Sequence, residues 1–85
     1  MSQKEKLLRK LCSKPKDMTF DELETLLNYL GYVRSNKGKT SGSRVLFEGE
    51  GLQPIFMHKP HTSGAPLKAY QILEILSTLK EESLI

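Results

Sequence analysis

The sequence predicts one small α+β domain in which helices pack on one face of a three-stranded antiparallel sheet. Two patterns indicate this class. Apolar residues recur at helical spacing before residue 31 and again after residue 66, whereas short apolar segments divided by turn residues fill the middle of the chain. Because the three middle segments are close together in the sequence, an antiparallel meander is the simplest topology.

The first helix is expected over residues 3–13. Leu7, Leu8 and Leu11 form one apolar stripe, and lysine and arginine side chains occupy the opposite side of that helix. Pro15 ends the helix, because a proline in a helix interior removes a hydrogen bond and clashes with the preceding turn.

The second helix is expected to begin at Thr19. Glu22 follows three residues later, at the spacing of a capping box, in which each side chain bonds to the other residue's backbone. Gly31 is the natural left-handed residue after the last turn. The expected buried face consists of Phe20, Leu23, Leu26, Leu27 and Leu30.

Three strands are expected at residues 32–35, 43–48 and 52–58. In the second strand, alternation places Arg44, Leu46 and Glu48 on one face, with Val45 and Phe47 on the other. Pro54 marks the third strand as an edge strand or a bulged one, because proline cannot donate to the ladder.

The last helix is expected from Leu67 to about Lys80, directly after Pro66. Its apolar residues fit either of two stripes, which consist of Tyr70, Leu73 and Leu76, or of Ile72, Ile75 and Leu79. The tail at residues 81–85 is expected to fray.

Positive charge gathers in two stretches, although the net charge is only +3. Residues 1–18 carry six basic and two acidic side chains, and residues 31–68 carry the same numbers. The stretches 19–30 and 69–85 are net acidic. A basic central region suits a polyanionic partner such as RNA, and a plain solvated surface is the alternative.

The single cysteine, Cys12, can form neither an internal disulfide nor a metal site of its own. We expect it to be a packed or half-exposed helix residue in a protein of the reducing cytoplasm. No run of about 20 apolar residues exists, so no membrane span is expected. No metal or other cofactor is expected either.

Both histidines, His58 and His61, lie where the third strand is expected to end, in the run Met57-His58-Lys59-Pro60-His61. Histidine titrates near neutral pH, so an imidazole in a basic loop suits proton transfer at RNA phosphates. The alternative for His58 is a structural histidine at a strand end. The alternative for His61 is an exposed histidine in a loop.

Several short motifs together resemble the HicA toxins of bacterial type II toxin–antitoxin modules. They are Leu30-Gly31-Tyr32 at a helix end, Gly42-Ser43-Arg44 with Phe47 at a strand start, His58 at a strand end, and Leu67-Lys68 before an apolar helix. The resemblance covers residues 19 to about 80. We therefore expect a HicA-like domain at residues 19–85 and an N-terminal helical extension at residues 1–18.

The resemblance implies a fold like that of double-stranded-RNA-binding domains and the activity of an mRNA endoribonuclease that a HicB-type antitoxin neutralises. The family's usual strand start is Gly-Ser-His, and that histidine is its catalytic residue. Here Arg44 stands in the third position, and arginine stays protonated. The proton transfer therefore falls on His58 or His61, or the activity is weakened or absent.

Metal-free RNA cleavage needs a base, an acid and a cation that stabilises the phosphorane. His58 is the first candidate for proton transfer and His61 the second. Contacts to single-stranded RNA are expected from Arg44, Lys59, Lys68, Lys37, Lys39 and Ser43. Two alternatives stay open: a non-catalytic RNA-binding module on the same fold, and a subunit whose basic face only binds an acidic protein.

Overall fold

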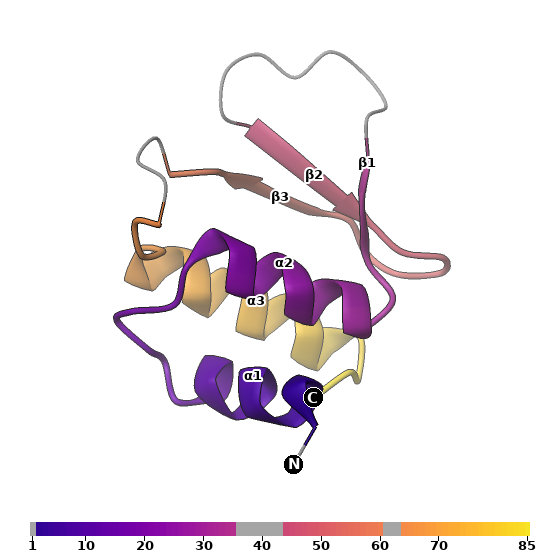
Figure 1. The fold of residues 1–85 in the computed structure, drawn as a ribbon. Coiled ribbons are helices and arrows are strands. Elements are labelled where there is room, and N and C mark those ends of the chain that lie inside the picture. The colour runs from indigo at the N-terminus through magenta and orange to yellow at the C-terminus, as the bar shows by residue number, and fades with distance from the viewer. Residues whose placement is uncertain (1, 36–43, 61–63) are drawn as a thin grey trace.

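The predicted α+β class is confirmed. The computed structural model describes residues 2–35, 44–60 and 64–85. In chain order the elements are α1 (Gln3–Cys12), α2 (Phe20–Tyr29), β1 (Val33–Ser35), β2 (Arg44–Glu48), β3 (Ile55–His58) and α3 (Ala69–Glu81). Figure 1 shows three layers: the sheet, then α2 with α3, then α1 on the side away from the sheet.

The predicted capping box starts α2. The Thr19 hydroxyl accepts the Glu22 N–H at 3.3 Å, and the Glu22 carboxylate accepts the Thr19 N–H at 3.1 Å. The same carboxylate pairs with the Lys10 ammonium at 3.0 Å, which joins α1 to α2. Gly31 follows α2 with a φ of 103°, in the left-handed region that favours glycine.

The sheet is the predicted antiparallel meander, in the order β1-β2-β3. β3 is an edge strand, as Pro54 indicated, but it begins at Ile55, later than predicted. Leu52 belongs to a turn instead, because its N–H donates to the Gly49 carbonyl at 3.0 Å. Gln53 also bonds outside the sheet, since its carbonyl accepts the Tyr32 hydroxyl at 2.8 Å.

One core lies between the sheet and the helices. From the sheet it contains Phe47, Ile55 and Met57, and the Phe47 ring lies 6.0 Å from the Phe20 ring between centroids. Leu7 and Leu11 of α1 belong to the same core, so the N-terminal helix and the rest of the chain share it. Such sharing is expected of a chain too short for two cores.

The C-terminal helix settles which of its two apolar stripes is buried. Ile72, Ile75 and Leu79 are buried, as is Leu76 between them, whereas Tyr70 and Leu73 are about half exposed. The prediction that residues 81–85 fray is wrong. Leu84 and Ile85 pack against the core, and the Leu84 N–H donates to the Leu79 carbonyl at 2.9 Å. Within the described part of the chain, every helix is too short or too polar to cross a membrane.

Candidate nucleic-acid interface

Arg44 and His58 are direct partners across the β2–β3 ladder. Both are exposed, at the end of the sheet where β2 begins and β3 ends. Directly opposed residues of an antiparallel pair have Cβ atoms about 4.5–5.5 Å apart and point to the same face. The register therefore sets a guanidinium and an imidazole side by side on the face of the sheet that no helix covers.

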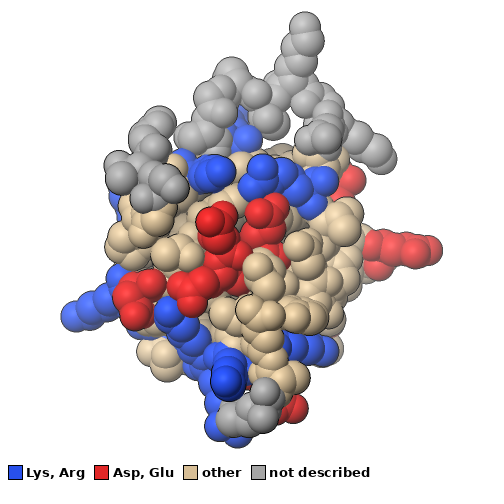
Figure 2. Space-filling model, in the orientation of Figure 1, with Lys and Arg blue, Asp and Glu red and all other residues tan. Residues whose placement is uncertain are grey.

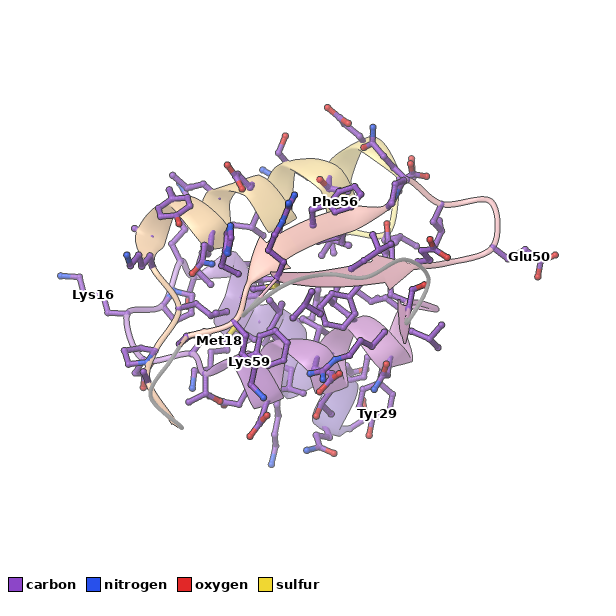
Figure 3. All side chains as sticks on the ribbon, turned by 90° about the horizontal axis from the view of Figure 1, so that it is seen from above. Lys16, Met18, Tyr29, Glu50, Phe56 and Lys59 are labelled. Carbon is purple, nitrogen blue, oxygen red and sulfur yellow. The ribbon has the colours of Figure 1, made fainter. Side chains whose placement is uncertain are left out.

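We call this face the open face. By alternation and register its residues are Val33, Ser35, Arg44, Leu46, Glu48, Phe56 and His58. Figure 3 looks toward this layer from above, and the labelled Phe56 lies over the sheet. Arg44 and His58 lie at one end of the face and Glu48 at the other. The charges of the open face are therefore separated along its length, with Arg44 at the His58 end and Glu48 at the opposite end.

Gln71 fixes the end of β3 against α3. Its side chain is buried, with the residue 6% exposed. The amide nitrogen donates to the His58 carbonyl at 3.0 Å, and the amide oxygen accepts the Lys68 N–H at 3.0 Å. Because one side chain holds both backbones, the start of α3 lies beside His58. The structure thus brings Lys68 to the same end of the sheet as Arg44 and His58.

Lys59 lies on the other side of the sheet. Its ammonium is 5.4 Å from the centroid of the Phe20 ring, and the Arg34 guanidinium is 5.2 Å from the same centroid. Arg34 also pairs with Glu24, from Nε to a carboxylate oxygen at 3.0 Å. Lys59, which the sequence predicts as an RNA contact, therefore lies on the side of the sheet opposite to His58.

Figure 2 shows the charge distribution on one side of the molecule. Lysine and arginine side chains gather toward the sheet layer and again toward α1, and a group of acidic side chains lies between these two groups. The acidic group fits the composition of α2, which carries Asp21 and Glu22 in its first turn. Positive charge thus lies both on the part of the molecule that contains the sheet and on the part that contains α1, as the two basic stretches of the sequence indicate.

The remaining predicted site residues lie outside the described residues. They are His61, Lys37, Lys39 and Ser43. Among residues 2–35, 44–60 and 64–85, no three side chains of His, Cys, Asp or Glu gather closely enough to hold a metal ion. The described part of the site therefore consists of Arg44, His58 and Lys68 with the residues packed around them.

A hollow of about 410 Å³ lies away from the sheet, between the linker after α1 and the start of α3. Leu67 and Leu73 line it, and Lys14 and Lys16 are the ionisable groups in its wall.

Sequence reasoning missed three residues of this region: Arg34, Phe56 and Gln71. A signal existed for Phe56, because it stands two residues before His58 in a strand and must share its face. For Gln71 the signal was its place in the buried stripe of α3, one residue before Ile72. A polar residue in such a stripe needs a buried partner.

The fold and the site define a small α+β protein whose open sheet face carries an arginine beside a histidine at one end and a glutamate at the other. Comparison of the chain with protein-family models, with curated proteins and with solved structures gave no match. The function is therefore argued from the residues of the site.

Proposed function

We propose that the chain is a metal-independent endoribonuclease of the HicA type, which cleaves mRNA in the cytoplasm and is neutralised by a HicB-type antitoxin. The observation that carries this proposal is the pairing of Arg44 with His58 on the open face. The order α2-β1-β2-β3-α3 supports it too, since double-stranded-RNA-binding folds have this α-β-β-β-α order.

The chemistry assigns a role to each group. The ribose 2′-hydroxyl attacks the neighbouring phosphorus, His58 removes the hydroxyl proton, and the 5′-oxygen leaves after it takes up a proton. The products are a 2′,3′-cyclic phosphate and a 5′-hydroxyl. Arg44 offers two parallel N–H groups to the phosphate oxygens and stabilises their charge in the transition state. Lys68 adds a point charge at the same end of the sheet.

The second proton transfer needs another group or a second use of His58. His61 is the predicted group, three residues further along the chain. Whether His61 takes part determines how the cleavage rate depends on pH. A single working imidazole gives a rate that depends on one ionisation, whereas an acid and a base together give a bell-shaped pH dependence.

A non-catalytic RNA-binding module is the second candidate. The observation that favours it is Arg44 itself, since a permanently charged guanidinium stands where the HicA family has its catalytic histidine. On the described open face, His58 is the one imidazole, and Glu48 lies at the opposite end. Such a module would bind RNA with a steep dependence on salt, because phosphate contacts release counterions.

The test is to incubate the protein with an unstructured RNA in EDTA and analyse the fragment ends. We expect fragments that end in 2′,3′-cyclic phosphate. His58→Ala and His58→Gln should both lower the cleavage rate by about 10²–10⁴-fold, the usual contribution of a general acid or base. Both variants should keep the wild-type circular dichroism spectrum, because the His58 side chain is exposed and is not part of the core.

Lys80→Ala is the control, because Lys80 is an exposed cation in the last turn of α3. RNA binding without cleavage by the wild type would favour the non-catalytic module. Full activity of both His58 variants would remove His58 from the mechanism. Absence of both binding and cleavage would contradict the two candidate functions together.

A further inference from the structure

Phe56 is a large aromatic side chain in the middle of the open face, and 61% of it is exposed. Its neighbours in β3, Ile55 and Met57, are buried, so alternation of the strand directs the Phe56 ring away from the core. Among the described residues, the ring–ring contact is that of Phe20 with Phe47, and Phe56 takes no part in it. The Phe56 ring thus offers a π-face to solvent.

The register sets this ring next to the two groups proposed to act on RNA. Phe56 and His58 lie on the same face of β3, two residues and therefore about 6.6–6.8 Å apart along the strand. Arg44 is opposite His58, so it is the diagonal neighbour of Phe56, at about 7–8 Å. An apolar ring, an imidazole and a guanidinium thus form one compact triangle.

A nucleotide has chemical groups that match this triangle of side chains. It joins a flat base, which stacks on aromatic rings, to an anionic phosphate through a ribose. The charges of the face also give the nucleotide a direction. Arg44 attracts phosphate at the His58 end, and Glu48, paired with Val33 at the other end, repels it.

A protein partner fits the exposed apolar residues less well. They are Val33, Leu46 and Phe56, of which Leu46 is partly buried. A stable protein interface buries roughly 800 Å² on each partner and has few charges at its centre. Three apolar side chains beside an arginine fall well short of such a patch, whereas one base needs only one ring.

We infer that Phe56 is a stacking platform for an unpaired nucleobase, which holds the adjoining ribose-phosphate between Arg44 and His58. The inference rests on the proposed RNA partner and adds the contact that selects a single strand. The substrate is single-stranded, because a base inside a duplex stack cannot lie on the ring. Every base has a π-face, so this position accepts all four bases.

The experiment is a titration of a fluorescently labelled oligouridine, followed by anisotropy at one fixed salt concentration. Phe56→Ala should bind about 5–150-fold more weakly, which is the usual effect of removing one stacking aromatic. Phe56→Tyr and Phe56→Trp should bind like the wild type. Phe56→Leu should be as weak as Phe56→Ala, since leucine keeps apolar surface but has no π-face.

Tyr70→Ala is the matched control, because Tyr70 is an aromatic on α3 of similar exposure, 53%. It should leave the affinity unchanged. A second titration uses the same oligonucleotide with abasic sites in place of bases. The wild type should then bind as weakly as Phe56→Ala binds the intact strand, and Phe56→Ala should lose no further affinity.

The outcomes separate this inference from the proposed function. A wild type that binds no RNA overturns both. A wild type that binds RNA as tightly as Phe56→Ala or Phe56→Leu overturns stacking alone. Loss of a protein complex in Phe56→Ala, with unchanged RNA affinity, also overturns it and makes the face a protein-docking surface. RNA binding that depends on Phe56 without any cleavage supports stacking and removes only the nuclease.

Discussion

The two faces of the sheet are built from the same three strands but follow different rules. On the helix side, Phe47 is fully buried and Ile55 is 5% exposed. On the open face, Phe56 and Val33 are 61% and 62% exposed. The helix side is explained by packing, since its side chains form the core of a small chain. The open face has no such explanation, so its composition is informative about binding.

The cationic side chains of the two faces also differ in whether other residues of the protein contact them. On the helix side, Arg34 lies over the Phe20 ring and pairs with Glu24, and Lys59 lies over the same ring. These contacts are ones that stabilise a fold. On the open face, Arg44 makes no ion pair with the described residues, and its direct partner is His58. Its guanidinium remains available for a phosphate.

The largest expected effect on stability comes from truncating two adjacent residues of β2 that lie on opposite faces of the sheet. Phe47→Ala should lower the free energy of unfolding by about 3–5 kcal/mol, because it leaves a cavity in the core. Leu46→Ala, one residue earlier on the open face, should cost less than about 1.5 kcal/mol, since Leu46 is only partly buried. Urea denaturation followed by circular dichroism measures both values.

The expected effects of the same two variants on RNA affinity have the reverse order. Leu46 is the cross-strand partner of Phe56, so its truncation should weaken the binding of an oligonucleotide. Phe47→Ala should bind normally under conditions in which it remains folded. Equal losses of stability in the two variants would show that the open face is packed by something, and would contradict the distinction between the faces.

Sequence patterns predicted the elements because local signals and burial agree there. The capping box at Thr19, the glycine after α2 and the alternation in β2 each select one structure. The open face could also be placed in β2, since Arg44, Leu46 and Glu48 alternate with apolar residues. In β3 the apolar run Ile55, Phe56 and Met57 does not by itself show which side is buried, and only the spacing of two residues from His58 places Phe56 on the open face.

The position of Lys59 depended on something that sequence does not contain. Alternation ends with the strand at His58, and the side chain that follows is directed by the loop and by whatever surface is near. That surface is the Phe20 ring at the start of α2, almost 40 residues earlier. Gln71 is a similar case, because its partners at His58 and Lys68 are defined only once α3 lies against β3.

Gln71 offers the second test, since this buried residue of α3 holds the backbone of His58, whose side chain lies on the open face. Gln71→Ala should cost about 1–3 kcal/mol of stability, because the His58 carbonyl and the Lys68 N–H lose their partner in partly buried hydrogen bonds. It should also slow cleavage more than it weakens RNA binding, since it frees the backbone of His58 and touches no RNA. The measurements are urea denaturation, oligonucleotide affinity and the cleavage rate on one RNA.

Gln53→Ala is the matched control, because Gln53 is an exposed glutamine in the turn before β3. Its loss should change stability by less than about 0.5 kcal/mol, as is usual for exposed sites. If Gln71→Ala lowers stability but leaves the ratio of cleavage to binding unchanged, Gln71 supports the fold and does not position His58.

The smallest expected effect is a pH dependence of stability that comes from Glu22, a residue of the helix layers and not of the open face. The pKa of the Glu22 carboxyl is lowered below its usual 4.5, first because the Thr19 N–H donates to it and then because of Lys10. A carboxyl with a lowered folded pKa stabilises the fold above its unfolded pKa, and that stabilisation is lost as the pH falls through the folded value. Since the Glu22 side chain is 34% exposed, the effect should stay below about 1 kcal/mol.

Glu22→Gln should therefore be less stable than the wild type by a constant amount above pH 5, and the difference should shrink at lower pH. Lys10→Ala keeps the Thr19 hydrogen bond, which is the larger cause, and should retain most of this pH dependence. Neither variant should change RNA affinity at neutral pH, because Lys10 and Glu22 join α1 to α2 in the helix layers. A large loss of RNA binding in Lys10→Ala would extend the binding surface beyond the sheet and contradict the assignment of RNA contacts to the open face.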